Sequence, residues 1–218
     1  MRWPRPVGEV RAERAPRLHL ASRNAKKIEE MQRILDEHLP GVRVVGLDDV
    51  PAYDEPIEDE PTFTGNALKK ARSGAAATGL PSLADDSGLC VDALNGMPGV
   101  LSARWAGPPK DDRRNNELLL AQLDDVPDHR RTAHFECAVA YCHPDGTELV
   151  VHGRMPGRVI RELRGSGGFG YDVLFVSEEH QAAGTTSAEL DPAEKDRISH
   201  RGRALREIAP AVAEHLRR

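Results

Sequence analysis

Cysteines and long apolar runs are both scarce in this sequence. The three cysteines, Cys90, Cys137 and Cys142, form no C-x-x-C pair, and such a scattered, odd-numbered set favours a reducing compartment. The basic N-terminal segment has no apolar run behind it, so we interpret it as neither a signal nor an anchor. No stretch approaches the roughly 20 apolar residues of a membrane span. These absences predict a soluble, cytoplasmic protein with no membrane partner.

Positive charge is also in short supply. The chain has 30 Lys and Arg against 35 Asp and Glu, for a formal net charge of −5. Residues 1–17 carry +3, so residues 18–218 carry −8. Proteins that bind long nucleic acids have a basic balance, and the acidic body argues against that class. A small polyanion would have to be bound by a few well-placed cations and a metal ion.

Several catalytic signatures are missing as well. The Walker loop G-x-x-x-x-G-K-[ST], the zinc motif H-E-x-x-H and the serine-hydrolase elbow G-x-S-x-G are all absent. Cys137 and Cys142 are predicted on opposite faces of one strand, so they do not form half of a zinc site. The sequence therefore predicts neither a zinc centre nor a serine hydrolase.

The length of 218 residues suits one sizeable domain with interleaved strands and helices. Residues 1–16, rich in Pro and Arg, predict a flexible extension ahead of a single domain over residues 17–218. Apolar runs and alternation predict strands over residues 18–21, 42–45, 82–84, 133–141, 148–151 and 173–176. Periodicity and capping residues predict helices after Asn24, from Thr64 or Asn66 to Gly79, over 117–123, from Asp191, and over 205–216 across Pro210. This interleaving predicts an α/β fold.

The first segment with candidate chemistry lies where a strand turns into a helix. Backbone N–H groups and the positive end of the helix dipole bind phosphate at such a turn, and lysines add charge. An ordinary capped helix with solvated lysines is the alternative. The segment comprises Ser22, Arg23, Asn24, Ala25, Lys26 and Lys27.

The second segment is the carboxylate pair Asp85-Asp86, followed by Ser87 and Gly88, at the predicted end of a strand. Adjacent carboxylates suit Mg²⁺, which prefers oxygen ligands, and one of them could act as a general base toward water. Glu58, in an acidic loop, is a source of a further ligand. A plain turn and a solvated acidic loop are the alternatives.

The remaining segments combine an aromatic side chain with cations. Residues 165–170 match G-x-G-x-x-G but lead into a strand, which argues against a dinucleotide site. The same loop could present Phe169 to a planar base, with Asp172 as a hydrogen-bond acceptor, or be a mobile surface loop. Lys195 and the run Ser199-His200-Arg201 could bind phosphate or a carbonyl-bearing base, or form a basic helix surface. Together the segments predict nucleoside triphosphate chemistry with Mg²⁺.

Five stretches occur in the order LASRNAKKIEE, FTGNALKKA, LADDSGLCVDALNGMPGVLSARWAG, GGFGYD and KDRISHRGRAL. In these stretches the chain resembles the inosine triphosphate pyrophosphatase family, from about residue 18 to about residue 216. The resemblance implies an elongated α/β fold shared with Maf-like proteins. In that fold a long central mixed β-sheet carries helices that form two lobes with a cleft between them, usually in a homodimer.

The resemblance also implies Mg²⁺-dependent hydrolysis of non-standard purine nucleoside triphosphates, namely ITP, dITP and XTP, to the monophosphate and pyrophosphate. Asp86 would bind Mg²⁺ and take a proton from water, with Glu58 as the second metal carboxylate and Lys70 as a catalytic cation. The residues implied around the substrate are Ser22, Arg23, Asn24, Ala25, Lys26, Lys27, Ser87, Phe169, Gly170, Tyr171, Asp172, Lys195, Ser199, His200 and Arg201.

Three positions depart from the family pattern. Gly65 stands where Glu is frequent, Val173 where Pro is usual, and Arg23 where a small residue is common. We expect activity to survive these changes. A Maf-like nucleotide pyrophosphatase acting on pyrimidine or modified nucleotides and a non-catalytic nucleotide sensor are the alternative functions.

Overall fold

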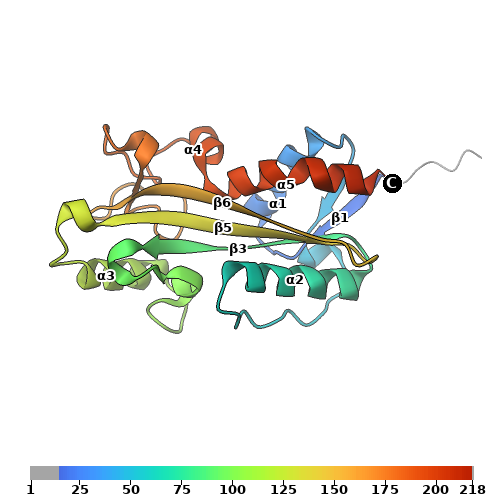
Figure 1. Ribbon diagram of the computed structural model, residues 1–218, viewed down its shortest axis with the longest axis horizontal. Helices are drawn as coiled ribbons and strands as arrows, with labels where there is room; N and C mark the ends of the chain where they lie inside the picture. Colours follow the sequence, from blue (N-terminus) through green and yellow to red (C-terminus); the bar gives the residue numbers. More distant parts are fainter. Residues whose placement is uncertain (1–14, 218) are drawn as a thin grey trace, which may run out of the picture.

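The computed structural model describes residues 15–217, apart from the side chain of Lys26. They form an elongated α/β protein built on one long sheet (Figure 1). Nearly all of the predicted extension over residues 1–16 lies outside the described residues. The strands are β1 (Arg17–Leu20), β2 (Arg43–Val45), β3 (Ser82–Val91), β4 (Met97–Pro98), β5 (Thr132–Cys142), β6 (Glu148–Val159) and β7 (Phe175–Ser177).

The sheet is mixed, with the strand order β2-β1-β3-β5-β6-β7 and with β4 attached to β3. β1 runs parallel to both β2 and β3, whereas the other pairs are antiparallel. The predicted hairpin is confirmed, and its second strand, β6, is much longer than the sequence pattern indicated. The long strands β3, β5 and β6 give the molecule its length.

The prediction that a strand ends at Ala84 is wrong. β3 continues to Val91, and its register with β5 is unbroken from Ser82 opposite Cys142 to Val91 opposite Ala133. The strand continues because β5 offers backbone partners along its whole length and because residues 88–91 are buried. Asp85 and Asp86 therefore lie within a regular strand, and their side chains leave opposite faces of the sheet.

All five predicted helices are present, but those predicted over 117–123 and 205–216 each begin five residues earlier, at Asp112 and His200. The cap of the second helix also needs correction. Thr62, rather than Thr64 or Asn66, caps the second helix, since its side chain accepts the N–H of Gly65 at 3.0 Å. Gly79 ends that helix with a φ of 66°, as the sequence predicted. The helices are α1 (Ala25–Asp36), α2 (Phe63–Thr78), α3 (Asp112–Gln122), α4 (Pro192–Ile198) and α5 (His200–Leu216), the last running through Pro210.

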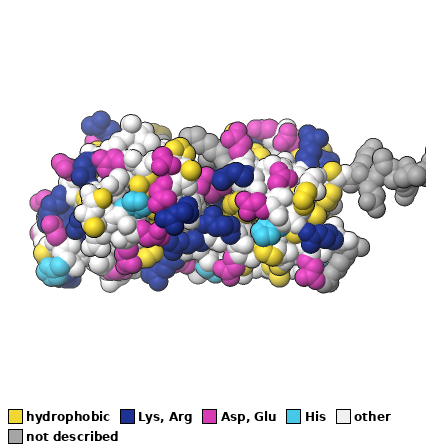
Figure 2. Space-filling view, turned by 90° about the horizontal axis from the view of Figure 1, so that it is seen from above, with side chains coloured by type: hydrophobic (Ala, Val, Ile, Leu, Met, Phe, Trp, Pro, Cys, Tyr) yellow, Lys and Arg dark blue, Asp and Glu magenta, His cyan; other side chains and the backbone are white. Residues whose placement is uncertain are grey.

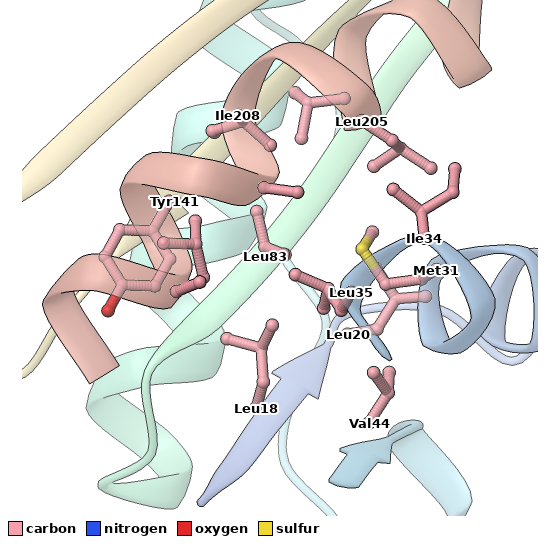
Figure 3. Packing of buried hydrophobic residues seen from close by; sticks show 14 of the residues in the cluster. Leu18, Leu20, Met31, Ile34, Leu35, Val44, Leu83, Tyr141, Leu205 and Ile208 are labelled. Carbon is pink, nitrogen blue, oxygen red and sulfur yellow. The ribbon is translucent and has the colours of Figure 1, made fainter. Parts of the chain in front are cut away.

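Helices cover both faces of the sheet. α1 and α5 lie on one face and α2 and α3 on the other (Figure 1). Beneath α1 and α5, large aliphatic side chains such as Leu20, Leu83 and Ile208 pack together (Figure 3). Burying one such side chain stabilises the fold by about 1.5–3 kcal/mol. α2 instead presents small residues, Ala67 and Ala71 among them, to alanines of the sheet, so its backbone approaches closely.

The outer face formed by α4 and α5 carries mixed charge. Figure 2 shows Lys and Arg side chains near the middle of this face with acidic side chains among them. This mixture agrees with the ion pairs of the two helices, in which Arg197 and Arg203 each lie 2.7–2.8 Å from Glu179. Among residues 15–217, no helix is both long enough and apolar enough to cross a membrane.

Candidate active site

A gap in strand pairing leaves part of one edge of β3 without a neighbouring strand. β1 pairs with β3 as far as Leu83, and β4 pairs with it again from Cys90. Among the described residues, no strand covers positions 84–89 on that edge. The gap lies at the carboxyl end of β1, the position where open α/β sheets bind ligands. Asp85 and Asp86 lie in this gap.

On the α1 and α5 face, Asp85 is enclosed by cations. Lys27 Nζ lies 2.9 Å from both carboxylate oxygens, and Arg201 Nε donates to Oδ2 at 3.1 Å. Asp85 is only 6% exposed and Arg201 only 8%. Burial would raise the pKa of Asp85, but Lys27, Arg201 and Lys70 together hold that pKa well below its usual value. Asp85 is therefore a buried, fully ionised counter-ion.

On the α2 face, Asp86 is less well compensated. Asn66 donates to its Oδ2 at 2.9 Å, while Lys70 Nζ is 3.9 Å from its Oδ1. Lys70 Nζ instead donates its shorter hydrogen bonds to Glu58 Oε1 and to the backbone oxygen of Asp85, both at 2.6 Å. Burial raises the pKa of Asp86 and outweighs the opposing effects of Lys70 and Asn66, and the carboxylates of Glu58 and Asp85 add to the rise. A carboxylate with a raised pKa in a crevice is suited to accept a proton.

Glu58 and Asp86 also form a donor set that fits a hard cation. Both carboxylates lie within 4 Å of the one Lys70 ammonium, so they can face a common ligand. Mg²⁺ is commonly held by one or two carboxylates, completed by water and substrate phosphates. Glu58 and Lys70 line a pocket of about 560 Å³, together with Arg104 and Lys110. The surplus of negative charge around Asp86 is what an added cation would relieve.

The turn before α1 brings backbone N–H groups to the same gap. Ser22 Oγ accepts the N–H of Asn24 at 3.1 Å, and α1 has no acidic residue in its first turn. Arg23 binds Asp48 and Glu55, so its charge is already balanced at the surface. Lys27 reaches Asp85, as described above, and the side chain of Lys26 lies outside the described part of the chain. An anion at this turn would meet the start of the Ala25–Asp36 helix and Lys27.

The glycine-rich loop holds an exposed aromatic ring. Phe169 is 54% exposed, and its ring centroid is 5.0 Å from Lys195 Nζ and 5.9 Å from Arg201 Cζ. Asp172 fixes the loop by accepting the N–H of Phe169 at 2.8 Å and by pairing with Lys195. At Gly168, with a φ of 73°, a Cβ atom would collide with the Asp172 carboxylate. The ring is thus presented to solvent on a loop that is anchored from behind.

The strand predicted over residues 173–176 starts later than expected, at Phe175. Residues 171–174 form a turn because the N–H groups of Asp172 and Leu174 bond back to Phe169 and Tyr171. The Tyr171 hydroxyl donates to the oxygen of Ser102 at 2.9 Å inside the core. This side chain therefore points away from the crevice.

The start of α5 carries three of the predicted residues. Ser199 caps the helix by accepting the N–H of Gly202 at 2.9 Å. His200 stacks on Phe135 with ring centroids 5.0 Å apart, and its Nδ1 is buried without a protein partner. Burial lowers the pKa of His200 well below its usual value, so the ring is neutral. Arg201 Nη2 lies 3.4 Å from Ser87 Oγ, which joins this helix start to β3.

The structure thus gathers most of the predicted residues around one gap, on both faces of β3. Three further side chains contribute that the sequence did not single out for this site. Asn66 holds Asp86, Arg104 donates to the backbone oxygen of Glu58 at 2.9 Å, and Asp112 accepts the N–H of Gly170 at 2.7 Å. The position of Asn66 four residues before Lys70, on one helix face, is a signal that could have identified it.

Of the positions that depart from the family pattern, Gly65 has a local explanation. A Cβ atom at Gly65 would come within 2.7 Å of the Glu60 side chain, which already occupies that space. The Val173 side chain packs against the adjacent core, but nothing in the structure explains why Val rather than Pro stands there.

The fold and the side chains at the gap beside β3 define an α/β protein with a charged ligand site where the pairing of a long mixed sheet is interrupted. The sequence model of the Ham1 family matches residues 18–211. The chain belongs to the Ham1 family. It is 62% identical over 198 residues to a dITP/XTP pyrophosphatase of Nocardia farcinica, covering 90% of this chain and 95% of that protein. It is 55% identical to a dITP/XTP pyrophosphatase of Corynebacterium efficiens, covering 91% and 98%.

Solved structures agree with this assignment. A dITP/XTP pyrophosphatase from Mycobacterium abscessus superimposes with a TM-score of 0.73 at 52% identity, covering 89% of this chain and 99% of that one. A HAM1 protein from Coxiella burnetii superimposes with a TM-score of 0.82 at 40% identity, covering 91% and 99%. The predicted family and the predicted fold are both confirmed.

Proposed function

We propose that this protein is a nucleoside triphosphate pyrophosphatase that hydrolyses dITP, XTP and ITP to the monophosphate and pyrophosphate. It would thereby remove non-standard purines from the nucleotide pool. The observation that carries the proposal is the pairing of a proton acceptor, Asp86, with the cation Lys70 at the gap in β3. The relatives named dITP/XTP pyrophosphatase, which match nearly the whole chain, support the same substrate class.

In this proposal, residues on one face of β3 bind the substrate and residues on the other face take part in the hydrolysis. Lys27, Lys195 and Arg201 lie near the turn before α1 and the Phe169 ring, where they bind the triphosphate and the base. A base stacked on Phe169 places its phosphates toward the gap, and stacking of this kind is worth about 1–3 kcal/mol. Asp86, held by Asn66 on the α2 face of β3, takes a proton from the water that attacks at the gap.

Glu58 and Asp86 hold Mg²⁺ in this proposal. When bound, the ion neutralises charge on the phosphates and on the leaving pyrophosphate. Lys70 supports the same charge, because its ammonium is fixed between Glu58 and the backbone oxygen of Asp85 before substrate arrives.

Selectivity would come from donors at the base edge. A 6-oxo group accepts hydrogen bonds, whereas the 6-amino group of adenine would leave the same donors unpaired. His200, Ser199 and Arg201 lie at the start of α5, where Arg201 approaches the Phe169 ring and the buried Nδ1 of His200 has no protein partner. We assign the edge of the purine to these side chains, with Asp172 and Gly170 shaping the loop.

A nucleotide panel tests the proposal. With Mg²⁺ present, ITP, dITP and XTP are turned over with release of pyrophosphate rather than orthophosphate, while ATP, UTP and dTTP are poor substrates. A preference for UTP or dTTP would favour the Maf-like alternative. Tight ITP binding without turnover would favour a nucleotide sensor. We further propose a cytoplasmic homodimer, for which sedimentation at several concentrations should give twice the chain mass.

A further inference from the structure

Two histidines and an aspartate meet at the far end of α5 from the candidate active site. His143 and Asp145 lie in the turn between β5 and β6, and His215 lies in the last turn of α5. Asp145 Oδ1 is 2.9 Å from His143 Nδ1, and Asp145 Oδ2 is 3.3 Å from His215 Nε2. One potential ligand atom of each residue lies within 4.8 Å of the other two. The helix separates this cluster from Arg201 by about 20 Å.

We propose that His143, Asp145 and His215 form a binding site for one Zn²⁺ ion. Zinc holds nitrogen and oxygen ligands about 2.0–2.2 Å away, which puts tetrahedral ligand pairs about 3.3 Å apart. One oxygen of Asp145 lies 2.9 Å from His143 Nδ1, and the other lies 3.3 Å from His215 Nε2. One ligand atom from each residue already lies within 4.8 Å of the other two, so small side-chain movements would bring the set to zinc spacing, with water as the remaining ligand. Imidazole donors favour zinc over Mg²⁺, which prefers oxygen.

The surroundings suit a bound cation. All three side chains reach solvent in part, so an ion can enter without unfolding the chain. The N–H of Thr147 donates to Asp145 Oδ1 at 2.8 Å, which orients the carboxylate. The ion would replace the weaker 3.2 Å contact between the Asp145 N–H and His143 Nδ1.

A neighbouring tyrosine provides a separate observation. Tyr141 is fully buried, yet its hydroxyl has no hydrogen-bond partner in the protein. Its ring packs edge-on against His215 at 5.8 Å. Figure 3 shows the hydroxyl at the end of the α5 segment, pointing away from the other labelled side chains. Buried hydroxyls are normally paired, and a water held by the ion is a suitable partner.

A second cluster shows what a zinc site must avoid. Cys90, His134 and Glu136 also have ligand atoms within 4.8 Å of one another. However, Arg154 Nη2 lies 2.8 Å from His134 Nδ1. A guanidinium fixed at a potential ligand atom repels a divalent ion. Zinc should therefore bind more tightly to the cluster at the end of α5 than to the cluster around His134.

The test is a calorimetric titration of the full chain with Zn²⁺ in excess Mg²⁺, so that oxygen-rich sites are filled. We expect one Zn²⁺ per chain, with affinity lowered at least about tenfold in His215→Ala and in Asp145→Asn. His129→Ala is the matched control. His129 is an exposed histidine just before the start of β5, whereas His143 follows the end of that strand, so this variant should bind zinc like the unaltered protein. Saturating zinc should raise the Tm by about 5 °C, but not in His215→Ala.

Co²⁺ gives a second readout that does not depend on the variants folding. Its visible absorption on the unaltered protein should show low-coordinate nitrogen and oxygen ligation, and Zn²⁺ should displace it. Absence of stoichiometric zinc binding would overturn the proposal. So would binding that persists undiminished in both His215→Ala and Asp145→Asn.

Discussion

Asp85 and Asp86 are neighbours on β3, yet their side chains enter different surroundings on opposite faces of the sheet. Asp85 has two cations within 3.1 Å and a depressed pKa. Asp86 has two neutral donors, the Asn66 amide and the Ser87 N–H, together with a more distant ammonium and a raised pKa. A buried charge with full compensation stabilises the structure, whereas an incompletely compensated one is suited to chemistry.

The same contrast extends to the groups around each carboxylate. In the proposed function, Lys27, Arg201 and the Phe169 ring on the Asp85 face bind the substrate and take no part in the reaction. In the same proposal, Lys70 and Glu58 on the Asp86 face stabilise the charge that develops during the reaction. In the proposed function, changes on the first face should alter binding or stability, and changes on the second should alter turnover.

The largest expected effect is on turnover, from Asp86→Asn. The amide keeps the shape of the side chain but cannot take a proton, so kcat for pyrophosphate release from ITP should fall about 10³-fold. The circular dichroism spectrum should be unchanged. Full activity in this variant would remove Asp86 from the reaction and reverse the roles given to the two faces.

A smaller effect is expected from Phe169→Ala on the opposite face. Loss of stacking should raise KM for ITP about tenfold while kcat changes little. Leu163→Ala is a matched control, since Leu163 is also an exposed apolar side chain near this loop in sequence. A loss confined to kcat would show that the ring takes part in the reaction rather than in binding.

The smallest effect concerns stability as a function of pH. The depressed pKa of Asp85 means that its ion pairs stabilise the fold above about pH 4 and are lost as pH falls below that value. The raised pKa of Asp86 means that its contribution is complete at acid pH and is lost as pH rises through its pKa in the folded protein. Denaturation across pH should therefore show Asp86→Asn matching or exceeding the unaltered protein by up to about 1 kcal/mol at neutral pH.

Sequence patterns predicted helices and strands well where the structure depends on local sequence features alone. The alternation in β5 and the glycine at the end of α2 are local features, and both were confirmed. The continuation of β3 through Asp85 and Asp86 depends on pairing with β5, which is some fifty residues away along the chain. Local propensity for a turn at this motif was overridden by that pairing.

In the candidate site, too, local motifs were predictable and contacts between distant parts of the chain were not. Motifs and family resemblance identified Asp86, Lys70 and Phe169, which the structure brings to one gap. They did not reveal that Asp85 is neutralised from the other face, because that depends on Lys27 and Arg201 meeting across 174 positions of chain. Nor did they show that the Tyr171 hydroxyl turns into the core.

The most direct test compares the thermal unfolding of Asp85→Asn and Asp86→Asn without nucleotide or divalent ion. Removing Asp85 leaves two cations uncompensated, one of them buried, so stability should fall by about 3 kcal/mol and the Tm by about 10 °C. Removing the charge of Asp86 relieves an undercompensated carboxylate, so the Tm should stay level or rise. A similar fall in both variants, or a fall only in Asp86→Asn, would contradict the division of roles between the two faces of β3.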